Sequence, residues 1–263
     1  METNQQKMEI LGLSVTTGKY QDFIDRISAL AVAEKSSYVC VANVHMLVEA
    51  HKSKEFCTVV NNADIVTPDG MPLVWALRLL RNYKQDRVAG MDLLPDLLKL
   101  SEQNQLPVYF YGGTEDLIKK TREFLHAAFP ALPVAGFYSP PFRALTHNEE
   151  AEVEQKIKDS KAKIVFVILG CPKQEKWMAF MHGKVNACMI GIGGALPVLA
   201  GMQKRAPVWM QKSGLEWLYR FFQEPSRLAR RYTVTNTIFV WLLLKAWIKQ
   251  LFTTKLPGRK FTS

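Results

Sequence analysis

The sequence predicts an α/β fold in which a sheet is wrapped by helices. Short runs of β-branched and apolar residues alternate with longer segments of helical periodicity, which is the pattern of such a fold. The 263 residues are 48% hydrophobic and 22% charged, a composition that excludes a disordered, collagenous or disulfide-scaffold protein. The runs that we expect to be strands are Ile10–Val15, Tyr38–Ala42, Ile65–Thr67, Val108–Tyr111, Val134–Ala135, Ile164–Leu169 and Ala187–Ile192.

Two helices of the predicted fold have recognisable N-terminal signals. Thr114 precedes two acidic residues and is expected to cap a helix with one apolar face. Asn148, also followed by two acidic residues, is expected to cap another helix in the same way. The stretch 136–147, which contains two consecutive prolines, is predicted to be a long loop.

The alternation of strands and helices stops after Gly201, and we place a domain boundary there. The predicted organisation is a catalytic body, residues 1–202, followed by a helical appendage, residues 203–263. Two helical segments are expected in the appendage, Pro207–Gln223 and Pro225–Phe252, because Pro225 interrupts a continuous helix.

The net charge is concentrated in the predicted appendage. Residues 203–263 hold 12 Lys or Arg and two Asp or Glu, a difference equal to the formal net charge of +10 of the whole chain. The same stretch holds four of the six tryptophans. Cations combined with amphipathic aromatic side chains suit an anionic membrane surface or lipid head group.

The second appendage helix is predicted to carry a cationic stripe. At about 100° per residue, Arg227, Arg231, Lys245 and Lys249 fall on one side, with Arg230 one step round. Such a helix could lie in a bilayer interface, or it could pack on the body with its charges facing solvent. Its apolar stretches are shorter than the roughly 20 residues that a spanning helix needs, so we expect a peripheral association, with a short re-entrant segment as the alternative.

Cysteine usage and the N-terminal residues predict a cytoplasmic protein. The four cysteines include no CxxC pair, which favours a reducing compartment. Residues 1–8 are polar and lack the apolar core of a signal peptide.

Polar or glycine-rich residues follow four of the predicted strands. They are Asn43, Asp69, the pair Gly112 and Gly113, and Gln174. In an α/β protein, sites form at the C-terminal ends of the strands, where loops and helix N-termini meet. A glycine pair before a helix lets a phosphate approach the backbone, although it could equally be only a turn.

Asp69 and Arg87 are the side chains with the clearest chemical potential. Asp69 lies on a stiff turn and could act as a general base, or it could form an Asx-turn that only organises the loop. Arg87 could neutralise a phosphate with two hydrogen bonds, or it could form a surface ion pair. Gln174 could donate to a substrate or simply belong to the first turn of a helix.

Several familiar chemistries are excluded. The glycines at 191–194 fail the GxGxxG pattern, and the sequence contains no P-loop, GxSxG or HExxH motif. The five histidines have no metal-ligand spacing. We therefore predict no metal and no cofactor.

A series of motifs resembles the WecG/TagA/CpsF family of glycosyltransferases from about Ile10 to Tyr232. The motifs are Asn43 after a strand, Pro68-Asp69-Gly70-Met71, Arg87-Val88-Ala89-Gly90-Met91-Asp92-Leu93, Gly170-Cys171-Pro172-Lys173-Gln174-Glu175, and Lys204-Arg205-Ala206-Pro207 with Gly214-Leu215-Glu216-Trp217-Leu218-Tyr219-Arg220. The resemblance implies a Rossmann-like, mostly parallel body. It also implies an inverting, metal-independent transferase that moves a sugar from a UDP-sugar to a polyprenyl-diphosphate-linked sugar at the inner face of the bacterial membrane.

The same resemblance implies roles for individual residues. Asp69 matches the proposed catalytic base, and three residues match positions in the substrate pocket: Asn43, Arg87 and Gln174. In the appendage, which is expected to close the site and dock on the membrane, the arginines are expected to meet the diphosphates. The candidates there are Arg205, Arg227, Arg230 and Arg231.

Two departures leave the transferred sugar open between N-acetylmannosamine, its uronic acid and a hexose. Val41 stands where relatives often have Thr, and Pro197 stands where many have Asp. A non-catalytic membrane-docking scaffold is the alternative to an enzyme. No nucleic-acid partner is expected, because no RNP or KH signature accompanies the basic tail. An exposed aromatic surface could make the protein a homo-oligomer where no membrane covers it.

Overall fold

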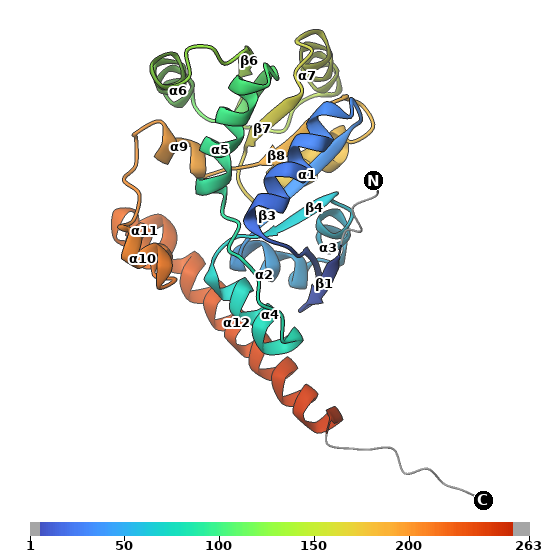
Figure 1. Cartoon of the computed structure of the whole chain (residues 1–263), viewed down its shortest axis with the longest axis vertical. Coiled ribbons are helices and arrows are strands. Elements are labelled where there is room, and N and C mark those ends of the chain that lie inside the picture. The colour runs from blue at the N-terminus through green and yellow to red at the C-terminus, as the bar shows by residue number, and fades with distance from the viewer. Residues whose placement is uncertain (1–5, 255–263) are drawn as a thin grey trace, which may run out of the picture.

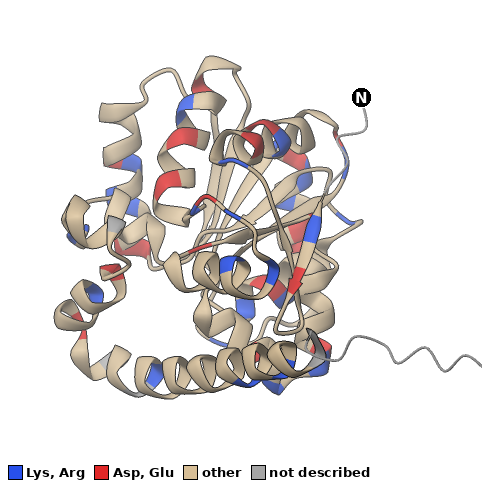
Figure 2. Ribbon diagram, turned by 60° about the horizontal axis from the view of Figure 1, so that its bottom comes forward, with Lys and Arg blue, Asp and Glu red and all other residues tan. Residues whose placement is uncertain are grey.

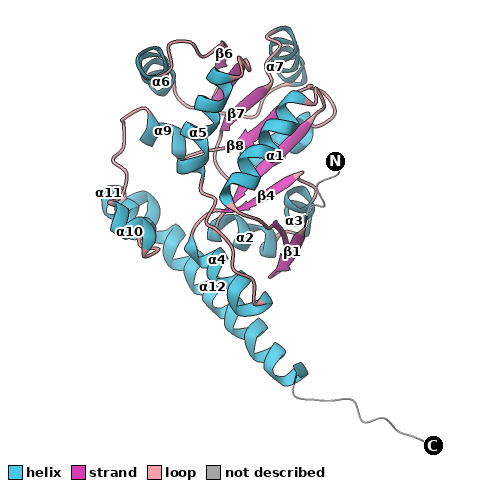
Figure 3. Cartoon of the chain, viewed as in Figure 1, coloured by secondary structure: helices cyan, strands magenta, loops and turns pink. Residues whose placement is uncertain are grey.

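The centre of the molecule is a six-stranded sheet with strand order β4-β3-β8-β7-β5-β6, in which all neighbours are parallel (Figures 1 and 3). The computed structural model describes residues 6–254, without the side chains of Lys212, Arg227, Arg230, Thr253 and Thr254. The strands are β3 (Ser37–Ala42), β4 (Ile65–Pro68), β5 (Val108–Gly112), β6 (Val134–Tyr138), β7 (Ile164–Ile168) and β8 (Cys188–Gly191). The predicted α/β fold with a mostly parallel sheet is therefore confirmed.

Helices cover both faces of the sheet and form two hydrophobic cores. Alternate residues of a strand point to opposite faces, so Tyr111 joins the first core and Phe110 the second. The helices of the first core are α2 (Val44–Lys52), α3 (Lys54–Asn61), α4 (Met71–Arg81), α7 (His147–Asp159), α8 (Lys173–Met181) and α12 (Pro225–Thr254). The helices of the second are α1 (Tyr20–Val32), α5 (Gly90–Gln103), α6 (Glu115–Ala128) and α9 (Ala195–Leu199).

The strand predicted over Ile10–Val15 is wrong, because this segment turns back on itself. It belongs to an antiparallel hairpin of β1 (Lys7–Ile10) and β2 (Leu13–Thr16). Leu11 and Gly12 both have positive φ, 52° and 94°, as a two-residue hairpin turn requires. The Thr16 hydroxyl accepts a 3.0 Å hydrogen bond from the Val66 amide and so ties the hairpin to β4.

One predicted helix cap is confirmed and one is wrong. The Thr114 side chain accepts a hydrogen bond from the Leu117 amide at the start of α6, as expected. Helix α7 begins at His147, one residue before the expected cap, so Asn148 lies inside it. Thr146 is the cap because it forms a reciprocal capping box with Glu149. The Thr146 hydroxyl accepts from the Glu149 amide, and the Glu149 carboxylate accepts from the Thr146 amide.

The loop predicted over 136–147 is shorter than expected. Strand β6 continues to Tyr138, so the loop covers only 139–146. The extra strand residues are held by aromatic packing, since the rings of Phe137 and Phe110 stack with centroids 5.0 Å apart.

The first appendage segment is two short helices where a single helix over Pro207–Gln223 was expected. They are α10 (Val208–Lys212) and α11 (Glu216–Gln223). Gly214 separates them with a φ of 74°, and the Leu215 amide bonds the Met210 carbonyl at 2.8 Å. A Cβ on Gly214 would lie 2.9 Å from the Trp75 ring of α4, so only glycine fits this approach.

The second appendage segment is the long helix α12, which packs along α2 and α4 (Figures 1 and 2). Its buried side is formed by Leu228, Thr235, Phe239 and Leu242. Its sequence contains five Lys or Arg and no Asp or Glu. This helix thus contributes Phe239 and Leu242 to the first core.

Candidate active site

The connections that leave the strands diverge at the C-terminal end of β8. The chain leaves β3 and β7 toward α2 and α8 on the first face, but it leaves β8 toward α9 on the second face. Neighbouring strands whose connections diverge leave an opening at the sheet edge, where ligands of open α/β folds bind. Asn43, Asp69 and Gln174 follow β3, β4 and β7 at this edge.

Asp69 follows β4 and is held by its backbone. Its amide donates to the Ala42 carbonyl at 2.7 Å, and Gly70, with a φ of 94°, turns the chain into α4. None of the hydrogen bonds within the described part of the chain uses the Asp69 carboxylate, so the Asx-turn alternative is not formed. Asp69 is largely surrounded by protein but keeps some solvent exposure, so its carboxylate remains available to a substrate.

The surroundings of Asp69 favour its protonated form. Burial raises the pKa of Asp69 to about 7, and the nearby Glu216 and Asp92 carboxylates add to the increase. The Arg87 and Arg220 guanidinium groups act in the opposite direction. Asp69 therefore titrates near neutrality, which is suitable for a general base.

Arg87 forms a largely buried ion-pair network with the appendage. Its Nη1 lies 2.6 Å from Glu216 Oε2 of α11, and its Nη2 lies 2.8 Å from Asp92 Oδ2 of α5. Only 17% of the Arg87 side chain is exposed, so this is not the surface ion pair considered above. Arg205 donates to the second oxygen of Asp92, which places Arg87 and Arg205 on either side of one carboxylate.

Arg220 of α11 lies at the same edge of the sheet, although sequence reasoning did not select it. A Cβ built on Gly194, just after β8, would lie 2.6 Å from Arg220 Nη2. The positive charge of Arg220 also lowers the pKa of Asp69, which indicates that its guanidinium lies near the ends of both β4 and β8. No ion pair within the described part of the chain includes Arg220.

Gln174 and Asn43 are fixed by local hydrogen bonds. Gln174, in the first turn of α8, accepts from the Gly170 amide at 3.1 Å and donates to Glu175 at 2.8 Å. Asn43 caps α2 by accepting from the Met46 amide at 3.2 Å. Its amide nitrogen has no acceptor among the described residues, and Asn43 therefore keeps a donor for a ligand.

Gly112 and Gly113 lie apart from Asp69, with three strands between β5 and β4 in the sheet. A Cβ on Gly112 would lie 2.5 Å from the Ile168 carbonyl oxygen, and the Gly113 amide donates to that oxygen at 3.0 Å. Close packing of β5 on β7 thus accounts for Gly112, and Gly113 packs closely on Leu117 of α6.

The three arginines predicted from α12 are only partly described. Arg231 lies near His45 at the start of α2. Burial lowers the pKa of His45, and the positive charge of Arg231 lowers it further. The buried Arg231 Nε has no hydrogen-bond partner in the described structure. Arg227 and Arg230 lie in α12, but their side chains are outside the described part.

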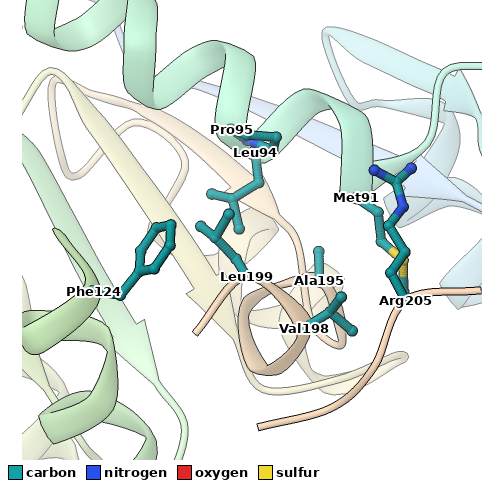
Figure 4. Close-up of a pocket in the computed structure, with 8 residues that line it drawn as sticks. All are labelled: Met91, Leu94, Pro95, Phe124, Ala195, Val198, Leu199 and Arg205. Carbon is teal, nitrogen blue, oxygen red and sulfur yellow. The ribbon is translucent and has the colours of Figure 1, made fainter. Parts of the chain in front are cut away.

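A pocket of about 230 Å³ lies on the second face, beside the Arg205 side chain (Figure 4). Its walls come from α5, α6, α9 and the segment that follows α9. They are Met91, Leu94, Pro95, Phe124, Ala195, Val198, Leu199 and Arg205. An apolar pocket beside a guanidinium suits a flat or apolar group that carries a phosphate.

The two sequence departures have structural consequences. Val41 is buried against Gly90, with its Cγ1 3.5 Å from the Cβ position of that glycine. Pro197 lies in α9, where its carbonyl accepts from the Met202 amide at 2.9 Å.

No group of His, Cys, Asp or Glu in residues 6–254 is arranged to hold a metal ion.

The fold and the site together define a class of enzyme. A carboxylate with a pKa near neutrality is surrounded by guanidinium groups at the C-terminal edge of a parallel sheet. Such an arrangement can remove a proton from one substrate next to an anionic second substrate.

The chain belongs to the glycosyl transferase WecG/TagA/CpsF family, whose profile matches residues 8–252. It is therefore a glycosyltransferase, and the resemblance found in the sequence is confirmed. Relatives from two Bacillus species cover most of the chain. The protein from Bacillus spizizenii is 33% identical over 205 residues, 78% of each chain. The one from Bacillus subtilis is 30% identical over 214 residues, 81% of this chain and 82% of its own.

A third relative, from Staphylococcus aureus, is 26% identical over 247 residues, 93% of this chain and 94% of its own. All three relatives are named N-acetylglucosaminyldiphosphoundecaprenol N-acetyl-beta-D-mannosaminyltransferase.

Proposed function

We propose that this glycosyltransferase moves N-acetylmannosamine from a UDP-linked donor to undecaprenyl-diphosphate-linked N-acetylglucosamine. The observation that carries the proposal is the shared name of relatives that match 78% to 93% of this chain. Among the three sugar classes left open by the sequence, these relatives favour N-acetylmannosamine. The reaction takes place at the inner surface of the cell membrane, where the lipid-linked acceptor is available.

Asp69 acts as the general base of the transfer. The acceptor hydroxyl oxygen forms a bond to C1 of the donor sugar while the bond from C1 to the UDP oxygen breaks. The hydroxyl proton passes to the Asp69 carboxylate, and the electron pair of the broken bond leaves with UDP. Attack from the face opposite UDP inverts the configuration at C1.

Arginines at the sheet edge stabilise the leaving diphosphate. Negative charge grows on the diphosphate in the transition state, and guanidinium groups fixed in advance lower its energy. Arg220 is the best placed of them, because it has no carboxylate partner in the described structure and lies near Asp69. Arg87 and Arg205, which share Asp92, contribute from the side of α5. The arginines of α12 extend this positive region.

The outward side of α12 forms the membrane contact. Lys245 lies beside this surface, with its Nζ 5.0 Å from the centroid of the Trp241 ring. A helix with exposed apolar side chains flanked by cations suits the interface of an anionic bilayer. No helix in residues 6–254 is long and apolar enough to cross a membrane. The exposed apolar residues are Val234, Val240, Trp241, Leu244, Trp247, Ile248, Leu251 and Phe252.

Replacing both Trp241 and Leu244 by glutamate is expected to weaken binding to anionic liposomes at least about tenfold, because two apolar anchors are lost and two negative charges are added. Co-sedimentation with phosphatidylglycerol vesicles measures the change. Phe142→Glu is the matched control, since Phe142 is 90% exposed on a loop far along the chain from α12. Unchanged liposome binding by the double variant would contradict the docking surface, as would RNA binding without liposome binding by the wild type.

Product detection by mass spectrometry tests the proposed reaction. The protein is mixed, in EDTA, with a panel of UDP-sugars and a short-chain polyprenyl-diphosphate N-acetylglucosamine. The expected result is a mass increase of one N-acetylhexosamine with UDP-N-acetylmannosamine alone. A product with a different donor would correct the sugar, and UDP binding without any product would favour the non-catalytic scaffold.

A further inference from the structure

One carboxylate of the appendage contacts the catalytic edge of the body. Glu216, the first residue of α11, pairs with Arg87 at 2.6 Å, and each side chain is only 17% exposed. Arg87 also pairs with Asp92, and Asp92 with Arg205. This alternating series of charges joins three segments: the loop before α5, the start of α5, and the appendage.

The ion pair is a major attachment of α11, because apolar burial holds this helix weakly. None of the described residues of α11 is fully buried. Other contacts of α11 are the turn at Gly214, which packs closely on Trp75 of α4, the hydrogen bonds between Gln223 and the Lys204 backbone, and the Trp217 ring against Tyr232 of α12. Glu216 joins the helix directly to the sheet edge, through Arg87.

Arg220 depends on the same attachment. Glu216 and Arg220 are four residues apart in α11, so they lie on one face of the helix. The first holds Arg87, and the second reaches Gly194 and affects the pKa of Asp69. A rotation or shift of α11 would therefore move the Arg220 guanidinium away from the site.

We propose that Glu216 is a positioning residue: its ion pair with Arg87 holds α11 against the sheet edge and so places Arg220 beside the leaving diphosphate. The proposal rests on the proposed function for the role of Arg220. It gives the junction of body and appendage a part in the reaction, separate from membrane docking through α12.

Glu216→Gln in the full-length chain tests the proposal, because glutamine keeps the size of the side chain and removes its charge. We expect kcat to fall about 10- to 100-fold, the usual effect of a misplacement near 1 Å, with little change in KM for the donor. We also expect trypsin to cleave faster after Lys204 and Arg205, next to the loosened junction. Glu154→Gln is the matched control, since it removes an exposed ion pair, with Lys158, on α7.

The pH dependence provides a readout that loss of general stability would not change. Glu216 raises the pKa of Asp69 more than Arg220 lowers it, and Arg87 also lowers it. Loss of the Glu216 charge is therefore expected to move the acid limb of the kcat/KM profile to lower pH, even with Arg220 displaced. The melting temperature should stay within about 2–4 °C of the wild type, the shift that about 1 kcal/mol produces in a chain of this size.

Two results would overturn the proposal. Unchanged kcat and unchanged cleavage would show that Glu216 fixes nothing that matters. Higher kcat with tighter UDP binding would show instead that Glu216 competes with the diphosphate for Arg87. Cleavage reports on the junction without any turnover, so a wild type that transfers no sugar would count against the proposed function alone.

Discussion

Asp69→Asn is expected to lower kcat for sugar transfer about 10²–10⁴-fold, the usual contribution of a positioned general base. Asparagine keeps the shape of the side chain, but it cannot accept the proton of the acceptor hydroxyl. Binding of UDP should be retained, because the arginines that meet the diphosphate are unchanged. Transfer kinetics and calorimetric titration with UDP measure the two quantities.

The same substitution is expected to stabilise the protein in mild alkali. Burial raises the pKa of Asp69 from 3.8 to about 7. The folded state therefore disfavours the ionised form, and stability falls as the pH rises through that interval. Asparagine carries no charge, so the melting temperature should increase at about pH 8, by about 2–4 °C per kcal/mol recovered, and change little near pH 4. Wild-type kcat in this variant would remove Asp69 from the mechanism.

Arg220→Ala is expected to lower kcat about 10²–10³-fold, as loss of a preorganised group facing transition-state charge does in other enzymes. The physical reason is that no carboxylate in the described structure neutralises Arg220, so its charge is available to the leaving diphosphate. Arg220→Lys should recover only part of the rate, because an ammonium group cannot donate two parallel hydrogen bonds to a phosphate.

Arg143→Ala is the control for the loss of one arginine. Arg143 is exposed and pairs with Glu149 near the start of α7. Its removal should leave kcat unchanged. Equal effects of Arg143→Ala and Arg220→Ala would contradict a specific role for Arg220, and the rates of the two variants under saturating donor decide between these outcomes.

The sequence predicted the sheet well because parallel strands are buried on both faces. Fully buried strands such as β3 and β7 are continuous apolar runs, which are recognisable without any tertiary information. The hairpin of β1 and β2 was missed because Leu11 adopts a positive φ that its side chain does not suggest. The break at Gly214 was missed because its cause, the Trp75 ring, is far away in the sequence.

Only some residues of the candidate site could be selected from the sequence, because the rest depend on contacts between distant segments. Asp69 and Asn43 were selected from their positions after strands, a rule that depends on topology alone. The roles proposed for Glu216 and Arg220 depend on how α11 packs against the body, which no local pattern contains. A signal did exist: the two residues share one face of a predicted helix within a recognised motif.

Of the two interpretations of α12 left open by its sequence, packing on the body is confirmed, and membrane docking stays a prediction. Leu228, Phe239 and Leu242 pack on the body, as an ordinary C-terminal helix would. The opposite side exposes Trp241 and Leu244 beside Lys245, which is the pattern expected for an interfacial helix. Periodicity alone could not separate these readings, because the helix is apolar on both sides.

The pH dependence of kcat/KM for transfer tests the central claim, that Asp69 is the base of the reaction. This parameter reports the ionisation of the free enzyme. Because Asp69 must be ionised to accept a proton, and burial raises its pKa to about 7, activity should rise through a single ionisation near that pH. The residual activity of Asp69→Asn should lack this limb. A wild-type profile that is flat between about pH 5 and pH 9, or an identical limb in Asp69→Asn, would contradict the account.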